Sequence, residues 1–177
     1  MADPVAARQL LNPSCLVALG FGSGLLPVAP GTAGTLAAVP LYLLLQDLPL
    51  GAYLTVVLVF LFGGILVCGY TAARLGVHDH PAIVWDEVVG YLVTMTAAPA
   101  GWSWLAAGFV LFRLFDILKP WPIGWLDRRV HGGTGIMLDD VIAGVFAAAL
   151  LQMLVYFLCP AGRRFSPQRR RERRDNK

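Results

Sequence analysis

The chain has 177 residues, of which 57% are hydrophobic and 14% charged, against about half and about a quarter in soluble proteins. This length and composition exclude a second substantial core and an ordinary soluble fold, and they predict an integral membrane protein with one domain. The net charge of +3 is unevenly distributed, because residues 163–177 carry +6 and residues 1–162 carry −3. A basic run directly after an apolar helix is typical of a cytoplasmic anchor. We therefore predict a membrane domain over 1–162, a basic tail over 163–177 and no nucleic-acid partner.

The first apolar region covers residues 9–46 without a charge, but the stretch from Gly20 to Gly34 interrupts it with five glycines and two prolines. Its last part, residues 35–45, is predicted to be a partial helix. Glycines and small hydroxyl residues before a helix can offer backbone N–H groups and the positive helix end to a phosphate. A glycine-rich turn between closely packed membrane helices explains the same pattern equally well. The phosphate-binding candidates here are Gly22, Ser23, Gly24 and Thr32.

Two uncharged stretches, residues 48–73 and 141–162, are each long enough to cross about 30 Å of hydrocarbon as a helix. A third lies between Glu87 and Arg113, but Pro99-Ala100-Gly101 divides it into two arms too short to cross singly. Irregular backbone at membrane depth is tolerated only where protein or a water-filled cavity satisfies it. The predicted fold is therefore an all-α, compact, multi-helix membrane bundle with broken and short helices around an acidic site.

The acidic site is indicated by seven of the eleven acidic residues, which fall within one segment together with all three histidines. Carboxylates near hydrocarbon are unfavourable unless they are paired, metal-bound or in contact with water. Gathered carboxylates with a few cations and a histidine suit a hard metal ion and a phosphate. The seven acids are Asp79, Asp86, Glu87, Asp116, Asp127, Asp139 and Asp140.

Two motifs in this segment have a structural and a functional interpretation. Asp86 and Glu87 stand directly before an apolar helix, where one acid would suffice to favour the helix dipole and the other is free for a ligand. Arg113, Asp116 and Lys119 recur at spacing three, which places them on one helix face. They could form a local ion-pair ladder, or the two cations could bind a phosphate.

The last motif, residues 127–140, combines cations, a histidine, a glycine-rich turn and an acidic pair that we expect to open a helix. Asp139 or Asp140 alone could be a helix cap, but the whole assembly is hard to explain as structure. His131 is a candidate proton carrier or hydrogen-bond donor to the phosphate, although a single histidine is often only a structural hydrogen-bonding residue.

A carboxylate-lined cation or proton transporter and another metal-dependent lipid-phosphate transferase are the alternative functions. A transporter would also place carboxylates at broken helices, but repeated halves with matching breaks are expected there, and the two breaks here differ. A CDP-alcohol phosphotransferase requires D-x-x-D-G-x-x-A-R, which the residues from Asp139 to Gly144 do not fit.

Residues 15–155 resemble the phosphatidylglycerophosphatase A family of bacteria. The resemblance rests on GFGSGLLPVAPGTAGT, IVWDEVVGY, FRLFDILKPWP and DRRVHGGTGIMLDDVIAGV. It implies an all-helical, multi-pass enzyme of the inner membrane that dephosphorylates phosphatidylglycerophosphate to phosphatidylglycerol with Mg²⁺. The C-terminal tail is expected to be cytoplasmic, the lipid substrate and the bilayer are the expected partners, and the oligomeric state is left open. The residues that match the family motifs are Asp86, Glu87, Asp116, Lys119, Asp139 and Asp140.

This resemblance and the charges together lead to a hypothesis for the site. A divalent cation must bridge a phosphomonoester dianion and a carboxylate cluster that would otherwise repel it. His131 is expected to protonate the leaving glycerol oxygen, and both direct attack by water and a covalent aspartyl-phosphate route remain open. The expected Mg²⁺ ligands are Asp86, Glu87, Asp139 and Asp140, with Asp79 and Asp116 as further ligands or bases. The residues expected to neutralise the phosphate are Arg113, Lys119 and Arg128, assisted by the backbone of residues 20–24.

Overall fold

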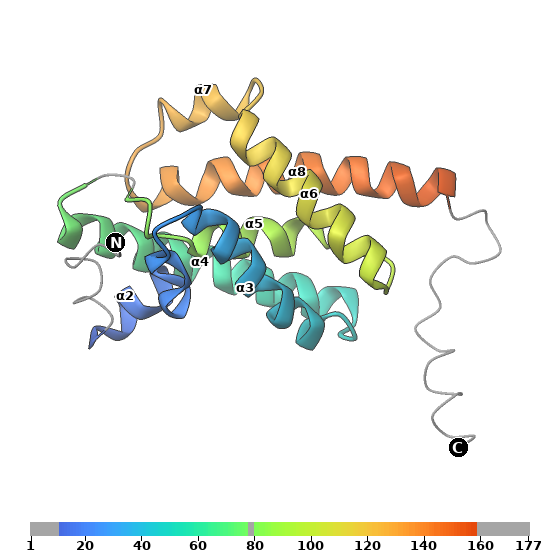
Figure 1. The fold of residues 1–177 in the computed structure, drawn as a ribbon, viewed down its shortest axis with the longest axis horizontal. Helices are drawn as coiled ribbons and strands as arrows, with labels where there is room; N and C mark the ends of the chain where they lie inside the picture. Colours follow the sequence, from blue (N-terminus) through green and yellow to red (C-terminus); the bar gives the residue numbers. More distant parts are fainter. Residues whose placement is uncertain (1–10, 78–79, 159–177) are drawn as a thin grey trace, which may run out of the picture.

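The computed structural model describes residues 11–77 and 80–158, and every regular element within these ranges is a helix (Figure 1). The predicted all-helical bundle is confirmed. In chain order the elements are α2 (Pro13–Ala18), the 3-10 helix η2 (Gly20–Leu25), α3 (Pro30–Leu45), α4 (Leu50–Leu75), α5 (Trp85–Thr94), α6 (Trp102–Leu118), α7 (Ile123–Asp127) and α8 (Gly132–Leu158).

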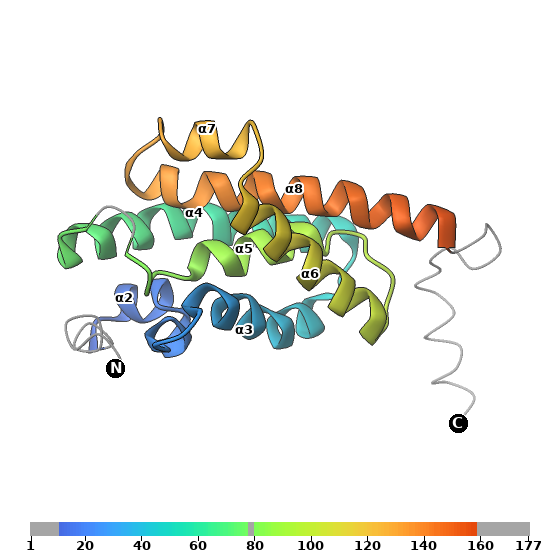
Figure 2. The same ribbon diagram turned by 45° about the horizontal axis from the view of Figure 1, so that its top comes forward.

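The short helix α5 lies at the centre of the bundle, in contact with α3, α4, α6 and α8. The long helices α4 and α8 run side by side along the molecule, and α3 and α6 cover the other sides of α5 (Figure 2). Most of the α5 side chains are buried, including the aromatic rings of Trp85 and Tyr91. The core of the protein is therefore built around α5, and residues in its first turn are enclosed by the bundle.

The helices α4 and α8 have 26 and 27 residues and are long and apolar enough to cross a membrane. Only 17% and 22% of their most apolar stretches are buried within the bundle, so their apolar side chains mostly face outward. A buried core helix of a soluble protein would show the reverse pattern. The predicted spans at residues 48–73 and 141–162 overlap these two helices, by length and composition, up to the last described residue at 158, while α3, with 16 residues, is too short to cross unaided.

The start of α8 differs from the prediction. The glycine-rich string after His131 was expected to be a turn, with Asp139 and Asp140 opening the helix. Instead α8 already begins at Gly132, so the two aspartates lie about two turns inside it. The string is helical because it packs against α4, and any side chain at Gly133 would collide with the carbonyl of Ile65.

The break in the first apolar region is also shorter than expected. Residues Gly20 to Gly34 were expected to be irregular throughout, but α3 begins at Pro30 and includes Gly31. Proline at the first position of a helix is favourable, because its missing N–H is not needed there. The predicted break at Pro99-Ala100-Gly101 is confirmed, since α5 ends at Thr94 and α6 begins at Trp102.

The helices α5 and α8 come together closely at two glycines, Gly90 and Gly144. A Cβ atom on Gly144 would lie 2.5 Å from the carbonyl oxygen of Gly90, and a Cβ atom on Gly90 would lie 2.8 Å from that of Asp140. Small residues at such crossings let two helix backbones come together. This contact places the first turn of α5 beside the Asp140 segment of α8.

Candidate active site

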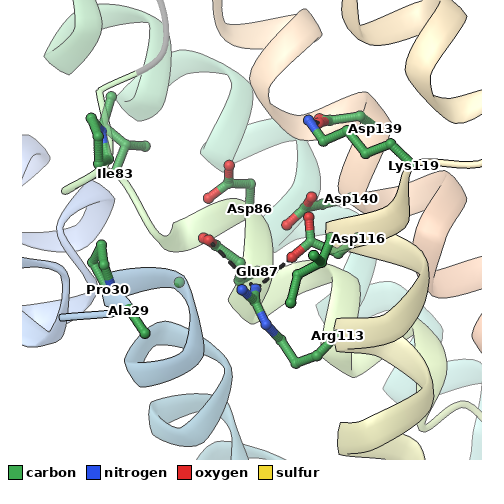
Figure 3. A pocket seen from close by; sticks show the side chains of 13 residues that line it. Ala29, Pro30, Ile83, Asp86, Glu87, Arg113, Asp116, Lys119, Asp139 and Asp140 are labelled. Atoms are coloured by element: carbon green, nitrogen blue, oxygen red, sulfur yellow. Dashed lines mark hydrogen bonds and ion pairs between the residues drawn. The ribbon is translucent and has the colours of Figure 1, made fainter.

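A cavity of about 430 Å³ lies where the start of α3, the start of α5, the end of α6 and the first part of α8 meet (Figure 3). Five carboxylates and two cations face it, together with a small apolar part. The lining residues are Ala29, Pro30, Gly31, Pro81, Ile83, Asp86, Glu87, Arg113, Asp116, Ile117, Lys119, Asp139 and Asp140.

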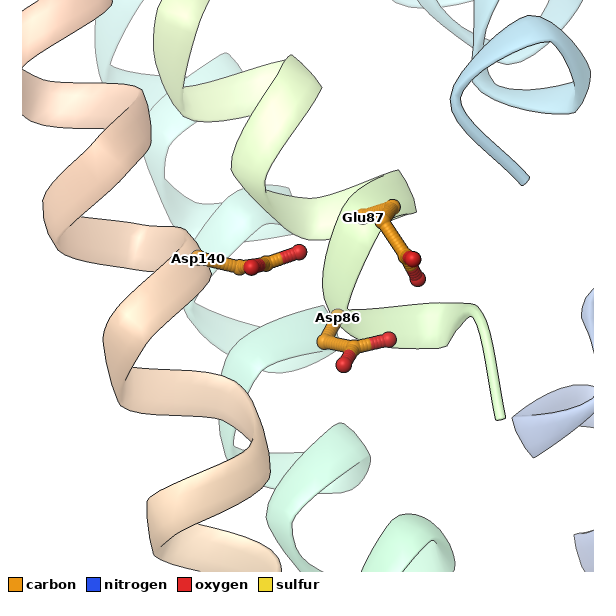
Figure 4. Close-up of side chains that lie close together, drawn as sticks. All are labelled: Asp86, Glu87 and Asp140. Carbon is orange, nitrogen blue, oxygen red and sulfur yellow. The ribbon is translucent and has the colours of Figure 1, made fainter. Parts of the chain in front are cut away.

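Three of the carboxylates form a compact group. Asp86 and Glu87 come from the first turn of α5 and Asp140 comes from α8 (Figure 4). Each offers one oxygen atom, and these atoms all lie within 4.8 Å of one another. Asp86 Oδ1, Glu87 Oε2 and Asp140 Oδ2 are buried and have no hydrogen-bond partner among the described residues. Such a group of unsatisfied oxygens is unfavourable without a positive charge beside it.

The pKa values of Asp86 and Glu87, the two carboxyl groups from α5, are raised in this environment. Burial raises the pKa of Asp86 well above its ordinary value, and the negative charges of Glu87 and Asp140 raise it further. Burial also raises the pKa of Glu87 to about 7, although a hydrogen bond with Asp86 and the charge of Arg113 act in the opposite direction. The cause is the same for both groups, namely that an ionised carboxylate here lacks water and has like charges as neighbours.

Two cations bind the remaining carboxylates. Arg113 donates a hydrogen bond from Nη1 to Asp116 Oδ2 over 2.5 Å, and the same nitrogen lies 3.8 Å from Glu87 Oε1. Lys119 donates from Nζ to Asp139 Oδ2 over 2.6 Å. Two cations do not compensate five carboxylates, so the ionised pocket keeps an excess of negative charge.

The donor set of the pocket fits a hard divalent cation. The three clustered residues offer only carboxylate oxygens, which are the ligands that Mg²⁺ prefers in proteins. The excess negative charge and the unsatisfied oxygens fit the same ion. Asp139 lines the pocket but binds Lys119 and stands outside the three-residue group. Its assignment as a metal ligand stays a prediction.

The start of α3 is the helix end that the sequence suggested for phosphate binding, but it lies at Pro30 rather than after Gly34. Ala29, Pro30 and Gly31 line the cavity, so the N-terminal end of a 16-residue helix faces it. The first N–H groups of a helix have no partner inside the helix, and together with the helix dipole they attract anions. Pro30 at the first helical position was the signal that could have located this helix start.

The glycine string that was expected to bind phosphate does not line the cavity. Ser23 donates its hydroxyl hydrogen bond to the carbonyl of Gly20 over 2.8 Å, and Gly24 is buried against Ala82. Gly22 has a left-handed backbone, with φ of 96°. These contacts support the alternative interpretation, a tight turn between packed helices. Thr32 lies in the first turn of α3 but is not among the lining residues.

Two further predicted residues also lie outside the cavity. His131 and Arg128 are both exposed, and neither lines it. The helical start of α8 and the short helix α7 carry them to the surface, which sequence spacing does not reveal. Asp79 lies outside the described residues. The other predicted residues, Asp86, Glu87, Arg113, Asp116, Lys119, Asp139 and Asp140, are brought together in one cavity.

Comparison with known proteins identifies relatives over most of the chain. Residues 16–155 match the model of the family described as phosphatidylglycerophosphatase A. A phosphatidylglycerophosphatase A of Escherichia coli is 51% identical over 147 residues, covering 82% of this chain and 86% of the relative. One of Haemophilus influenzae is 46% identical over 160 residues, covering 88% and 97%. A Bacteroides thetaiotaomicron protein, provisionally named a phosphatidylinositol-3-phosphatase, is 40% identical over 144 residues, covering 77% and 89%. No solved structure matches the chain.

Proposed function

The chain belongs to the phosphatidylglycerophosphatase A family, and from that premise we propose how its pocket carries out the reaction. The enzyme is a membrane phosphatase of phospholipid biosynthesis that removes the terminal phosphate of phosphatidylglycerophosphate and leaves phosphatidylglycerol. The observation that carries the mechanism is the cavity in which three clustered carboxylates lie beside Arg113 and Lys119.

Asp86, Glu87 and Asp140 are the residues that would hold a Mg²⁺ ion. The support is their all-oxygen donor set, its compactness and its unsatisfied buried oxygens. When bound, such an ion neutralises the carboxylates and polarises the phosphoryl oxygens of the substrate. Because α5 provides two of these carboxylates and α8 provides the third, the site forms only when the two helices pack together.

The cations and the start of α3 would hold the phosphate. Lys119 and Arg113 face the cavity from the end of α6, and the first N–H groups of α3 face it from the other side. Burial alone would lower the pKa of Lys119, but hydrogen bonds and charges from Asp139 and Asp127 outweigh it and raise that pKa above its ordinary value. Lys119 therefore stays charged and serves as a phosphate clamp rather than as a proton donor.

The proton transfers fall to the carboxyl groups of the cavity. His131 is exposed and does not line the cavity, so its predicted role as the acid has no support in the described geometry. A carboxylate facing the phosphorus atom either takes the proton of an attacking water or attacks the phosphorus itself. In the water route, the carboxyl group that has taken the proton of the attacking water would return that proton to the leaving glycerol oxygen, and Asp116, which lines the cavity and accepts a hydrogen bond from Arg113, is a candidate for this role.

Metal removal tests the proposal directly. Purified enzyme in detergent micelles should release phosphate from phosphatidylglycerophosphate with Mg²⁺, lose the activity in EDTA and regain it when Mg²⁺ is added in excess. Undiminished release in EDTA would contradict the metal assignment. Cation uptake by liposomes that contain no phosphorylated lipid would instead favour the transporter, an alternative that the family membership does not favour.

We also propose a membrane arrangement for the enzyme, in the bacterial inner membrane with a cytoplasmic tail. The basic tail follows α8 directly, and such runs stay on the cytoplasmic side. The two ends of α8 lie at opposite ends of the molecule, and the pocket lies in its first part (Figure 1). A fully crossing α8 then places the pocket toward the opposite face of the bilayer from the tail.

Single cysteines in a cysteine-free background test this arrangement. In intact cells a membrane-impermeant maleimide should label Val77→Cys, an exposed position just after α4 that shares a small pocket with Gly132 at the start of α8, and should leave Ser166→Cys in the tail unlabelled. Labelling of both in permeabilised cells is the control for reactivity. Protection of both in intact cells would show that α8 does not cross the membrane completely.

A further inference from the structure

Asp127 is an acidic residue for which the sequence suggested no separate role. It is the last residue of α7, the short helix that packs against α8. Its Oδ1 atom lies 3.0 Å from Lys119 Nζ, while Asp139 Oδ2 lies 2.6 Å from the same nitrogen. Lys119 is therefore held between a carboxylate of α7 and a carboxylate of α8.

The backbone of Lys119 is held by the same short helix. Lys119 caps α6 in the left-handed region, with φ of 41°, which is uncommon for a residue other than glycine. The N–H of Gly124 donates a hydrogen bond to the Lys119 carbonyl over 3.3 Å. A Cβ atom on Gly124 would come 2.8 Å from that carbonyl oxygen, so glycine is what allows α7 to approach so closely. The ammonium group and the backbone carbonyl of Lys119 are thus both bound by residues of α7.

We propose that Asp127 is a positioning residue that, with Asp139, aims the Lys119 ammonium group at the substrate phosphate. A lysine ammonium has three N–H donors, and two carboxylates leave the third for the phosphate. The lysine side chain is long and flexible, and ordering it on substrate binding would cost conformational entropy. Because the two carboxylates already order it in the free enzyme, substrate binding does not bear that cost. Asp139 then acts through Lys119, whereas its neighbour Asp140 belongs to the three-residue carboxylate group proposed to hold Mg²⁺.

The two carboxylates differ in exposure. The Asp139 side chain is 8% exposed and the Asp127 side chain 36% exposed. Asp139 is the inner partner, and its removal would leave the Lys119 ammonium group without its shorter ion pair. Asp127 is the outer partner, so it can be changed with less risk to folding, and it provides the cleaner test. The inference rests on the proposed contact between Lys119 and the phosphate.

The experiment measures kcat, KM and the Mg²⁺ concentration for half-maximal activity in the full-length enzyme. Asp127→Asn should raise KM for phosphatidylglycerophosphate by roughly fivefold, the scale of one partly exposed ion pair. Its kcat should stay within about twofold and its Mg²⁺ requirement should not change, because the metal group is untouched. Asp127→Glu should recover part of the loss. Asp47→Asn, on the loop after α3, is the charge-matched control and should behave like the unmodified enzyme.

A double-mutant cycle with Lys119→Met decides whether Asp127 acts through Lys119. In the Lys119→Met background, Asp127→Asn should have no further effect on KM. An additive effect, an unchanged KM in the single variant or a raised Mg²⁺ requirement would overturn the proposal. If thermal unfolding shows that Asp127→Asn does not fold, the double-mutant cycle is repeated with Asp127→Glu and Lys119→Met, and the same KM values are compared. Absence of metal-dependent release by the unmodified enzyme would instead refute the proposed function.

Discussion

Replacement of Asp140 by asparagine is expected to lower kcat/KM by about a thousandfold, equivalent to roughly 4 kcal/mol of transition-state stabilisation. Asp140 is the contribution of α8 to the three-residue carboxylate group, and asparagine keeps the shape while removing the charge. A neutral amide binds Mg²⁺ weakly, and the α5 pair alone provides ligands from one side only. The loss should appear with the natural lipid at concentrations well below KM, where the rate reports kcat/KM.

Two further measurements separate this explanation from a folding defect. The Mg²⁺ concentration for half-maximal activity should rise in Asp140→Asn and remain unchanged in Asp47→Asn. The free energy of unfolding without added metal should be unchanged or higher, because the variant removes one of several mutually repelling buried carboxylates. Full activity with an unchanged Mg²⁺ requirement would exclude Asp140 from the metal group.

Gly31→Ala is expected to lower kcat/KM by about a hundredfold, the loss that a misplacement of about 1 Å can cause. An alanine methyl group at this position would collide with Glu87 Oε1 and lie 3.1 Å and 3.2 Å from the two terminal nitrogens of Arg113. The methyl group would thus displace a proposed metal ligand and a proposed phosphate-binding group together. It would also occupy the N-terminal end of α3, where the phosphate is expected to approach.

The chain offers a matched control for this variant. Gly51 also lies in the first turn of a helix, but a Cβ atom there would have no atom within 4 Å. Gly51→Ala should keep full activity and, because alanine is the better helix former, should unfold at the same or a slightly higher temperature. Gly31→Ala should retain a cooperative unfolding transition while losing activity. Equal activity of the two variants would show that the start of α3 takes no part in the reaction.

The sequence did not separate the roles of Asp139 and Asp140, because neighbouring residues on a helix point in different directions. Asp139 and Asp140 were expected to act together, yet they lie about 100° apart around α8. Asp140 faces the α5 carboxylates and Asp139 faces Lys119 at the end of α6. No spacing rule assigns these directions before the packing partners are known.

The glycine strings show the same limit. Glycine permits a turn, a phosphate-binding loop or a close helix crossing, and local sequence does not choose among them. The string at residues 20–24 forms a tight turn away from the cavity, while the string beginning at Gly132 is helical against α4. Gly31, which was treated as part of a loop, is the glycine that borders the cavity.

The sequence by itself determined the membrane class, the two long helices, the break before α6 and most of the acidic and basic residues of the pocket. These features follow from composition, uncharged length and proline or glycine interruptions, all of which act locally along the chain. Only the tertiary structure decided which carboxylates form one group, which of them binds Lys119, and that the start of α3 faces the phosphate pocket. Those outcomes depend on the contact of Gly90 with Gly144 and on the packing of α7 against Lys119, where residues distant in sequence approach closely.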